Sequence, residues 1–192
     1  MIRLANSGDA QAVAEIYEPM VSRSAISFEL VAPTEAEMAA RIASTLAGMP
    51  WLVYERAGEV VGYAYGSRHR ERAAYQWSVD VSVYVGASAR RQGIGRALYL
   101  SLLGLLRLQG FYTAHAGITL PNPGSVRLHE SLGFRAIGIY PAVGYKLSAW
   151  HDVGWWQLAL RERVGQPLPP IPCEQAQKLP EWNAALACSE KL

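Results

Sequence analysis

The sequence contains little cysteine and little net charge. Only two cysteines, Cys173 and Cys188, occur among 192 residues, and neither has metal-ligand spacing to a pair of histidines, so we expect free thiols and no metal site. The formal net charge is +2, from 18 basic and 16 acidic residues. Such a balance gives no bulk attraction to nucleic acid or to an anionic membrane, and we expect neither as a partner.

Long hydrophobic runs are also missing. No uninterrupted apolar stretch reaches membrane-spanning length, and residues 1–6 do not begin a secretory signal, so we expect a cytoplasmic protein. The chain, 51% hydrophobic, is long enough for one domain with a sizeable core, which we assign to residues 1–164. The proline-rich run 166–172 cannot form a regular strand ladder, so residues 165–192 are predicted to be an extended tail.

The order of the predicted elements indicates a mixed α/β sheet. Strands are predicted at residues 2–5, 51–56, 60–66, 75–85, 112–118, 135–140 and 153–160. Helices are predicted at residues 7–23, at 34–46 behind a Thr34–Glu37 capping box, at 93–109, and from Asn122 to Gly133. Because strand, helix and strand follow one another between residues 75 and 118, we expect one parallel pair in an otherwise antiparallel sheet.

The predicted strand 75–85 alternates with a period of two. Its odd positions are all apolar, whereas Asp80, Ser82 and Tyr84 project from the other face at spacings of roughly 6–7 Å. An ordinary solvent-facing side would explain this pattern equally well for a strand taken alone. The glycine-rich turn that follows favours a pocket lined by these three side chains.

That turn, within residues 83–98, is the strongest functional signal in the chain. Gly93 and Gly95 remove side chains where backbone N–H groups would approach an anion, and the next helix offers its unpaired N-terminal donors and the positive end of its dipole. Arg90, Arg91 and Arg96 add positive charge. We interpret the turn as a site for a pyrophosphate.

Two other nucleotide motifs do not fit this turn. A P-loop requires a Lys-Ser/Thr pair after its glycines, and none is present. A Rossmann fingerprint would place its third glycine where Leu98 stands, and it follows a first strand rather than lying in the middle of a chain. The pattern that remains is Arg-x-x-Gly-x-Gly, from Arg90 to Gly95.

This pattern resembles the acyl-coenzyme A signature of the GNAT superfamily of N-acetyltransferases. The run from Asn122 to Phe134, with its Leu-Gly-Phe ending, resembles the second signature of the same superfamily. His129, together with the run 150–158, resembles the phosphinothricin acetyltransferase branch. By motif order the resemblance covers roughly residues 2–170.

The resemblance implies a single α/β domain, in which a mostly antiparallel sheet has a central parallel pair that splays at the cofactor site, with helices on both sides. It implies acetyl-CoA as cosubstrate, a small amino-acid-like acceptor such as phosphinothricin, methionine sulfoximine or methionine sulfone, and a homodimer. Implied cofactor contacts are Val83, Tyr84, Val85, Arg90, Arg91, Gln92, Gly93, Ile94, Gly95, Arg96, Asn122 and Ser125. Implied acceptor contacts are Phe28, Glu29, Arg70, Arg72, Asp80 and Ser82. An N-cap role alone would also explain Asn122.

Three residues are candidates for moving protons. The family glutamate on the strand before the cofactor turn corresponds to Asp80, which is one methylene shorter and would reach the acceptor amine through a water. His129 is the second candidate base, and a nearby carboxylate would orient it. The departing thiolate would take its proton from His129 or from Tyr84, and the sequence leaves that choice open.

Two other functions fit the same motifs. Acetylation of protein or peptide amines would need an open peptide groove, which the sequence does not exclude. A non-catalytic acyl-CoA sensor would keep the cofactor turn, although the retention of Asp80 and His129 beside that turn favours an enzyme.

Overall fold

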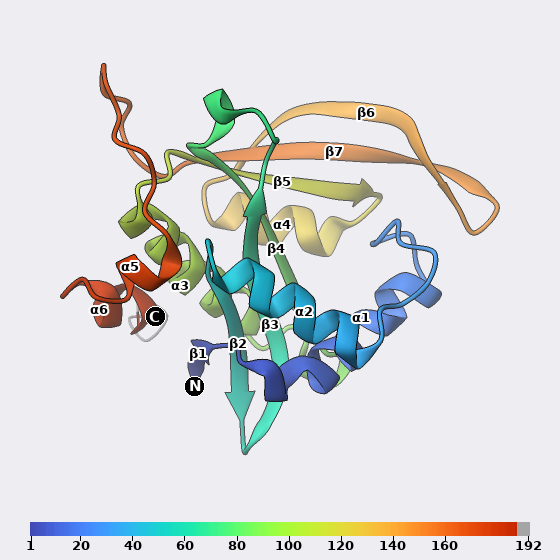
Figure 1. The fold of residues 1–192 in the computed structure, drawn as a ribbon. Helices are drawn as coiled ribbons and strands as arrows, with labels where there is room; N and C mark the ends of the chain where they lie inside the picture. The colour runs from blue at the N-terminus through green and yellow to red at the C-terminus, as the bar shows by residue number, and fades with distance from the viewer. Residues whose placement is uncertain (188–192) are drawn as a thin grey trace.

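The computed structural model describes residues 1–187 and contains one seven-stranded mixed sheet with the order β1-β2-β3-β4-β5-β7-β6 (Figure 1). The strands are β1 (Ile2–Leu4), β2 (Trp51–Arg56), β3 (Glu59–Arg68), β4 (Ser78–Val85), β5 (Thr113–Leu120), β6 (Arg135–Lys146) and β7 (Ala149–Ala159). The helices are α1 (Ala10–Ser22), α2 (Glu35–Leu46), α3 (Ile94–Gln109), α4 (Pro123–Ser131), α5 (Cys173–Ala176) and α6 (Trp182–Leu186). Three short 3-10 turns are Ser7–Asp9, Ala73–Tyr75 and Ala87–Ala89.

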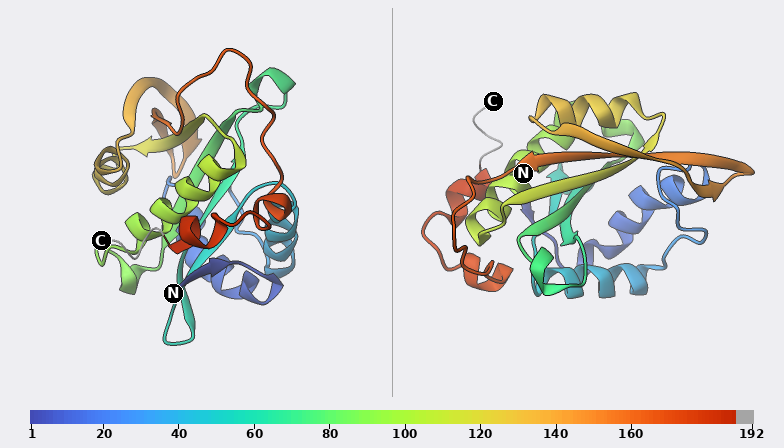
Figure 2. Two further views of the ribbon diagram at one scale, coloured as in Figure 1. Left: turned by 90° about the vertical axis from the view of Figure 1, so that its left-hand side faces the viewer. Right: turned by 90° about the horizontal axis from the view of Figure 1, so that it is seen from above.

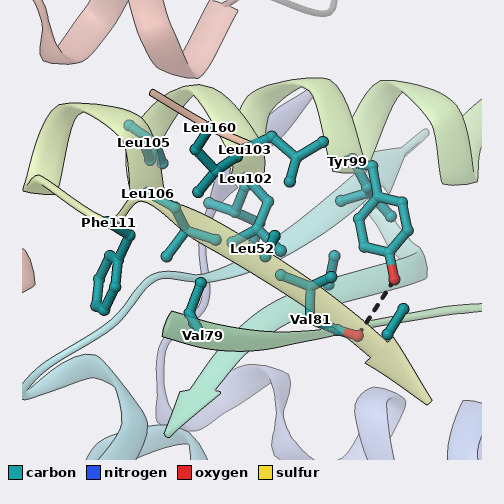
Figure 3. Packing of buried hydrophobic residues seen from close by; sticks show 14 of the residues in the cluster. Leu52, Val79, Val81, Tyr99, Leu102, Leu103, Leu105, Leu106, Phe111 and Leu160 are labelled. Carbon is teal, nitrogen blue, oxygen red and sulfur yellow. Dashed lines mark hydrogen bonds between the residues drawn. The ribbon is translucent and has the colours of Figure 1, made fainter. Parts of the chain in front are cut away.

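Helices cover both faces of the sheet and create two hydrophobic cores. Val79 and Val81 of β4 pack beneath the leucines of α3, as Figure 3 shows. On the opposite face, Tyr63 and Tyr84 pack in the core shared with α1 and α2. The period of two predicted for β4 is thus confirmed, although residues 73–75 form a 3-10 turn and the strand begins only at Ser78.

The parallel pair β4–β5 is short and then opens. The two strands are in register only from Ser78 to Asp80 and from Thr113 to His115. Beyond that point β4 stays paired with β3 and β5 stays paired with β7, but the two strands no longer pair with each other. In Figure 1, β2–β4 stand roughly upright, with neighbouring strands antiparallel, while β5–β7 cross above them. The predicted splayed pair is confirmed.

Strands β6 and β7 form a hairpin much longer than the sequence suggested. The predicted strands 135–140 and 153–160 are extended to 135–146 and 149–159. A register shift between Tyr140 and Gly144, which includes Pro141, is accommodated in the hairpin as a bulge. The turn at Leu147 and Ser148 has φ values of 52° and 61°, and the tip projects past the body of the molecule (Figures 1 and 2).

Lys146 fixes the tip of this hairpin to the end of α1 and to the loop that follows it. The residue is only 5% exposed. Its Nζ donates to the carbonyl oxygens of Val21, Ser27 and Glu29 at 2.5, 2.7 and 2.7 Å. A buried ammonium group needs such acceptors, so this contact holds two segments together that are more than a hundred residues apart in the sequence.

The C-terminal segment is packed on the domain. Residues 166–172 form no helix or strand, in agreement with the prediction, but the extended tail predicted for residues 165–192 is wrong beyond that point, because α5 and α6 form and lie beside α3 (Figure 2). Cys173 and Trp182 are buried in the α3 core, and the Cys173 N–H donates to the Gly48 carbonyl at 3.0 Å. Cys188 lies outside the described residues. Within residues 1–187, no helix has both the length and the apolar character needed to cross a membrane.

Candidate active site

A small cavity lies where β4 and β5 separate, and we call it the split cavity. It encloses about 60 Å³. Its walls are residues 81–84 of β4, residues 116–119 of β5, Ile26, Tyr99, Asn122, Ser125 and His129. The edge of β4 that faces β5 has no strand partner from residue 81 onward. An extended polar chain could therefore bond to this edge as an added strand does.

The N-terminus of α3 is suited to an anion. Gly93 is its N-cap with φ of 80°, and a Cβ placed there would meet nothing within 4 Å, so the space above it is open. The first backbone bond of the helix runs from the Ala97 N–H to the Gly93 carbonyl at 2.9 Å, which leaves the N–H groups of residues 94–96 without partners in the helix. Within residues 1–187, Arg96 Nη1 is buried without a hydrogen-bond partner. An anion at this helix end would satisfy the free N–H groups, and Arg96 adds positive charge on the same turn of helix.

The remaining turn residues take different parts. A Cβ on Gly95 would lie 3.3 Å from Leu128 Cδ2, so this glycine permits α3 and α4 to pack closely, and its side-chain space is not open to an anion. Arg90 donates to the Val85 carbonyl at 3.2 Å and approaches the sulfur of Met20 on α1. Gln92 accepts a bond from Arg56. Arg91 is exposed.

His129 is held between α4 and α3 at the split cavity. Its Nδ1 lies 2.8 Å from the Ser125 carbonyl, which can only accept, so this nitrogen carries the proton and Nε2 accepts from the Tyr99 hydroxyl at 3.0 Å. Burial lowers the pKa of His129, against a smaller rise from the Ser125 carbonyl. Asn122 caps α4 through a bond from the Ser125 N–H at 3.1 Å, as predicted. The imidazole is thus neutral and its tautomer is fixed.

A second histidine lies on the opposite face of the sheet. His69, just after β3, places Nδ1 2.6 Å from Oδ1 of Asp80 on β4. Its ring stacks on His115 of β5, with 4.2 Å between ring centroids and 14° between planes. Asp80 and His115 are register partners in the short parallel pair. These three side chains come from three strands or strand ends and meet only because of the sheet topology.

This cluster borders a cavity of about 200 Å³, which we call the His69 cavity. Its walls are His69, Arg70, His115, Ile137, Gly138, Tyr140 and Trp155. The Arg70 guanidinium lies 5.9 Å from the centroid of the Trp155 ring. Trp155 also packs against Gly117, where an added Cβ would lie 3.4 Å from the ring, and Gly117 borders the split cavity. Trp155, a wall of the His69 cavity, thus contacts Gly117, a wall of the split cavity.

Burial shapes the titration of this cluster. It raises the pKa of Asp80, although the hydrogen bond from His69 acts in the opposite direction. Burial also lowers the pKa of His115 to about 4, with further lowering from the charges of His69 and Arg70. His115 is therefore neutral at pH 7, and its Nδ1 is buried without a partner among the described residues. Within residues 1–187, no cluster of histidine, cysteine and carboxylate side chains could hold a metal ion.

Comparison with known proteins identifies the family. Residues 2–155 match the family model described as an acetyltransferase (GNAT) domain. The chain belongs to the GNAT acetyltransferases. The splayed β4–β5 pair, the α3 N-terminus and the segment from Asn122 to Phe134 are thus features of a GNAT domain in this chain.

Similar proteins include enzymes that act on small acceptors and one that acts on a protein. Phosphinothricin N-acetyltransferase of Streptomyces viridochromogenes is 42% identical over 156 residues, which are 81% of this chain and 85% of that protein. The crystal structure of a phosphinothricin acetyltransferase from Sinorhizobium meliloti with acetyl-CoA is 36% identical, covers 89% of this chain and 94% of that one, and has a TM-score of 0.84. Ribosomal-protein-alanine N-acetyltransferase from Brucella melitensis is 32% identical, covers 83% and 99%, and has a TM-score of 0.81.

The predicted proton-moving residues of this GNAT domain are not brought together. Asp80 and His129 lie on opposite faces of the sheet, and the carboxylate bonds to His69 rather than to His129. Tyr84 borders the split cavity, but its ring packs against Tyr17 and Tyr63 in the core under α1 and α2. Burial raises the pKa of Tyr84. The hydroxyl that contacts His129 belongs instead to Tyr99.

The predicted acceptor contacts are also spread over several places. Arg70 borders the His69 cavity, whereas Arg72 borders a separate hollow beside residues 170–172. Phe28 packs flat on Gly144, where an added Cβ would lie 2.5 Å from its ring edge. Ser82 borders the split cavity.

Glu29, another predicted acceptor contact, is occupied by other protein groups. Both of its oxygens bond to Arg41, at 2.7 and 2.9 Å, and Oε1 also accepts from Tyr17 at 2.8 Å. The bond from Arg41 lowers the pKa of the Glu29 carboxyl.

Sequence reasoning missed Tyr99, His69 and His115. Tyr99 is a lone aromatic in the leucine-rich stretch of α3, and that break in the pattern was a usable signal. His69 lies in a charged loop, and His115 stands between apolar residues of β5. No local pattern in the sequence distinguishes these two histidines, because their contacts with each other and with Asp80 depend on strand pairing and register.

Proposed function

We propose that this protein transfers the acetyl group of acetyl-CoA to the amine of a small amino-acid-like acceptor. The observation that carries the proposal is the β4–β5 split together with the unpaired donors at the N-terminus of α3, where Gly95 lies against Val83 and Val85 of β4. The similarity to phosphinothricin acetyltransferases supports the acceptor class. The main alternative is acetylation of a protein amine, which the similarity to the ribosomal-protein enzyme favours.

The residues fit acetyl-CoA in three ways. The N–H groups of residues 94–96 and the unpaired Arg96 Nη1 suit its phosphates, and the free edge of β4 suits its pantetheine arm. Acetyl-CoA would supply the thioester whose carbonyl carbon the acceptor amine attacks. His129 and Tyr99 hold one proton between them beside the split cavity, and that hydrogen-bonded pair can protonate a leaving thiolate.

The His69 cavity is our proposed acceptor site. Its volume of about 200 Å³ is below the range of roughly 300–1,000 Å³ that holds drug-sized ligands, which suits a small acceptor better than a peptide. Arg70 borders it and can pair with a carboxylate, because the guanidinium fork matches that group in charge and geometry.

An acceptor panel tests the proposal. Release of CoA from acetyl-CoA is measured with phosphinothricin, methionine sulfoximine, methionine sulfone, ordinary amino acids and peptides with N-terminal alanine. We expect turnover of the small acceptors and a kcat/KM at least about tenfold lower for peptides. Preference for the peptides would replace the small-acceptor assignment with protein acetylation. Binding of acetyl-CoA without turnover of any amine would favour a sensor.

We further propose a homodimer formed through β6. This strand is one of the two edges of the sheet and carries exposed apolar side chains along its length. Exposed apolar residues on the hairpin are Ile137, Ile139, Tyr140, Val143, Tyr145, Leu147 and Trp150. A long apolar edge strand invites pairing with another chain, and a second copy of the same edge is the simplest partner. We place the protein in the cytoplasm, where acetyl-CoA is available to it.

Sedimentation velocity over a range of protein concentrations tests the dimer. Wild type is expected to sediment as a dimer, and Tyr145→Glu with Trp150→Glu as a monomer, because each places a charge on the apolar edge. Wild type that remains a monomer at all concentrations would exclude this interface.

A further inference from the structure

Asp80 and His69 form a hydrogen-bonded carboxylate–imidazole pair in which the carboxylate fixes the tautomer of the imidazole. His69 Nδ1 lies 2.6 Å from Asp80 Oδ1, and a carboxylate can only accept, so Nδ1 carries the proton. In a neutral imidazole the other nitrogen, Nε2, is then an acceptor with a free lone pair. Nε2 makes no hydrogen bond to any of residues 1–187. It is also not one of the polar atoms of these residues that are both inaccessible to solvent and without a hydrogen-bond partner. A carboxylate that fixes an imidazole tautomer in this way prepares the imidazole to receive a proton.

His69 is one wall of the cavity that we propose for the acceptor. His69 borders the His69 cavity together with Arg70 and Trp155, and the Trp155 ring packs on Gly117, which borders the split cavity. The ring is held on its other side by His115, stacked at 4.2 Å. The side chain of His69 is 12% exposed, and that of Asp80 is 26% exposed. One face of the imidazole is therefore fixed by protein while the ring still reaches open space.

Asp80 is poorly placed to take the proton itself. One of its oxygens is already bonded to His69, and the aspartate side chain is one methylene shorter than the glutamate of the family pattern. The imidazole ring borders the cavity and lies between it and the carboxylate. It therefore spans the distance that the shorter aspartate side chain cannot. His69 and Asp80 together would thus do what the family glutamate does alone, which is to accept a proton from the acceptor amine.

We propose that His69 is the base that deprotonates the acceptor ammonium and that Asp80 is its positioning residue. The inference rests on the proposed function. Nε2 of His69 takes one proton from the R–NH₃⁺ group, and the free amine then bonds to the thioester carbonyl carbon. The carbon–sulfur bond breaks, and the second proton lost by nitrogen passes to the departing thiolate. His69 releases its proton to solvent through the cavity, so the reaction yields amide, CoA thiol and one proton.

Of the charged and titratable groups around His69, Asp80 favours this proton transfer, His115 is neutral and Arg70 opposes it. Asp80 balances the positive charge that the imidazole acquires, because the ion pair is within hydrogen-bond distance. His115 stays neutral at pH 7, so the stacked ring adds no second charge. Arg70 is the one cation that borders the cavity among the described residues, and it opposes the charge. Tyr75 and Trp155 face the ring edge-on, at 6.1 and 6.2 Å.

The test compares His69→Gln with Glu71→Gln, a matched control whose side chain is exposed on the same loop. With acetyl-CoA and the best acceptor, His69→Gln is expected to lose about 10²–10³-fold in kcat/KM at pH 7, the size of a general-base contribution. It should also lose the acid limb of the wild-type pH–rate profile. Glu71→Gln should keep both, and all three proteins should bind acetyl-CoA with the same Kd.

A measurement without turnover tests the pair in the free protein. Nitrogen-15 NMR of the imidazole is expected to show His69 protonated at Nδ1 in wild type and to lose this preference in Asp80→Asn. The same variant should lower kcat more than it raises KM for the acceptor. An unchanged tautomer in Asp80→Asn would overturn the positioning role of Asp80.

The outcomes separate this inference from the proposed function. A wild-type protein that turns over an amine, together with a folded His69→Gln variant of equal kcat/KM and equal pH profile, would overturn the base assignment and leave the acetyltransferase intact. A wild-type protein that acetylates no amine would overturn both. Circular dichroism and thermal unfolding establish that each variant is folded.

Discussion

The two faces of the sheet at the β4–β5 split are built in different ways. On the α3 face, the site consists mainly of backbone donors from one continuous turn, with His129 fixed by the neutral groups of Tyr99 and Ser125. On the other face, the site consists of side chains from distant segments, with His69 fixed by the carboxylate of Asp80. A site of backbone groups tolerates sequence change around it, whereas a site of side chains can change its chemistry through one or two substitutions. The comparison predicts that cosubstrate binding and acceptor chemistry can be damaged separately.

The largest expected effect is a loss of stability on the acceptor face that leaves the affinity for acetyl-CoA unchanged. Lys146→Met removes the donor of three carbonyl groups, two of them in buried bonds, and each buried carbonyl left unpaired costs about 1–3 kcal/mol, so we expect a loss of about 2–6 kcal/mol in the free energy of unfolding. Urea denaturation measures it. Lys178→Met is the control, since its partner Glu174 is on the surface and such pairs contribute about 0–1 kcal/mol. A parallel loss of acetyl-CoA affinity would show that the two faces are coupled.

The next effect damages the α3 face alone. Gly93 has φ of 80°, and a β-branched residue there costs roughly 1–3 kcal/mol or shifts the turn. We expect Gly93→Val to weaken acetyl-CoA binding about 10–100-fold in calorimetry. Gly58→Val imposes a similar strain at φ of 84° in the β2–β3 turn, and it should leave the Kd unchanged. Wild-type affinity in Gly93→Val would remove the anion site from the α3 N-terminus.

Acid should weaken the fold through the opposite face. The pKa of His115 is about 4 in the folded protein against 6.5 for an ordinary histidine, so the unfolded chain binds the proton first and stability falls as the pH drops below about 6.5. We expect a loss of about 1–2 kcal/mol between pH 7 and pH 5 from this residue. His129 acts in the same direction, and Asp80, whose pKa is raised, acts against it.

Urea denaturation at both pH values compares wild type with His115→Phe. The variant should show a smaller difference between the two pH values, because the group that resists protonation is gone. An equal difference in both proteins would place the pH sensitivity elsewhere in the molecule.

The smallest expected effect concerns the neutral histidine pair. Tyr99→Phe removes the hydroxyl that bonds Nε2 of His129, and one such bond contributes about 1 kcal/mol, so we expect kcat to fall about fivefold with little change in the Kd for acetyl-CoA. Tyr112→Phe is the control, because its hydroxyl bonds to nothing within residues 1–187. Equal rates for wild type and Tyr99→Phe would exclude this hydroxyl from proton transfer.

The difference between the faces also explains what the sequence could predict. The turn through Gly93, the cap at Asn122 and His129 lie in two short motifs, and the fold class followed from strand order and from the alternation in β4. Local patterns cannot show which residues of separate strands become neighbours. Asp80 meets His115 only through the register of β4 with β5, and it meets His69 only because β3 returns beside β4.

The hairpin β6–β7 was underestimated for a different reason. Pro141 and Gly144 are residues that usually end strands, but a bulge accommodates both, and Gly144 leaves the space in which Phe28 packs. The buried Lys146 likewise has the composition of a surface residue, and only its three carbonyl partners make its position inside the protein favourable.

The burial of Cys173 makes the C-terminal segment accessible to chemical measurement. Its thiol is fully buried, and burial raises its pKa, so a thiol reagent cannot attack it while the segment stays against α3. Reaction then requires a local opening, and under weakly denaturing conditions the labelling rate reports the free energy of that opening. After Cys188→Ser removes the second thiol of the sequence, the labelling rate of Cys173 measures how often the C-terminal segment opens. Labelling with and without acetyl-CoA would then reveal whether a ligand at the N-terminus of α3 changes the free energy of opening of the segment packed beside that helix.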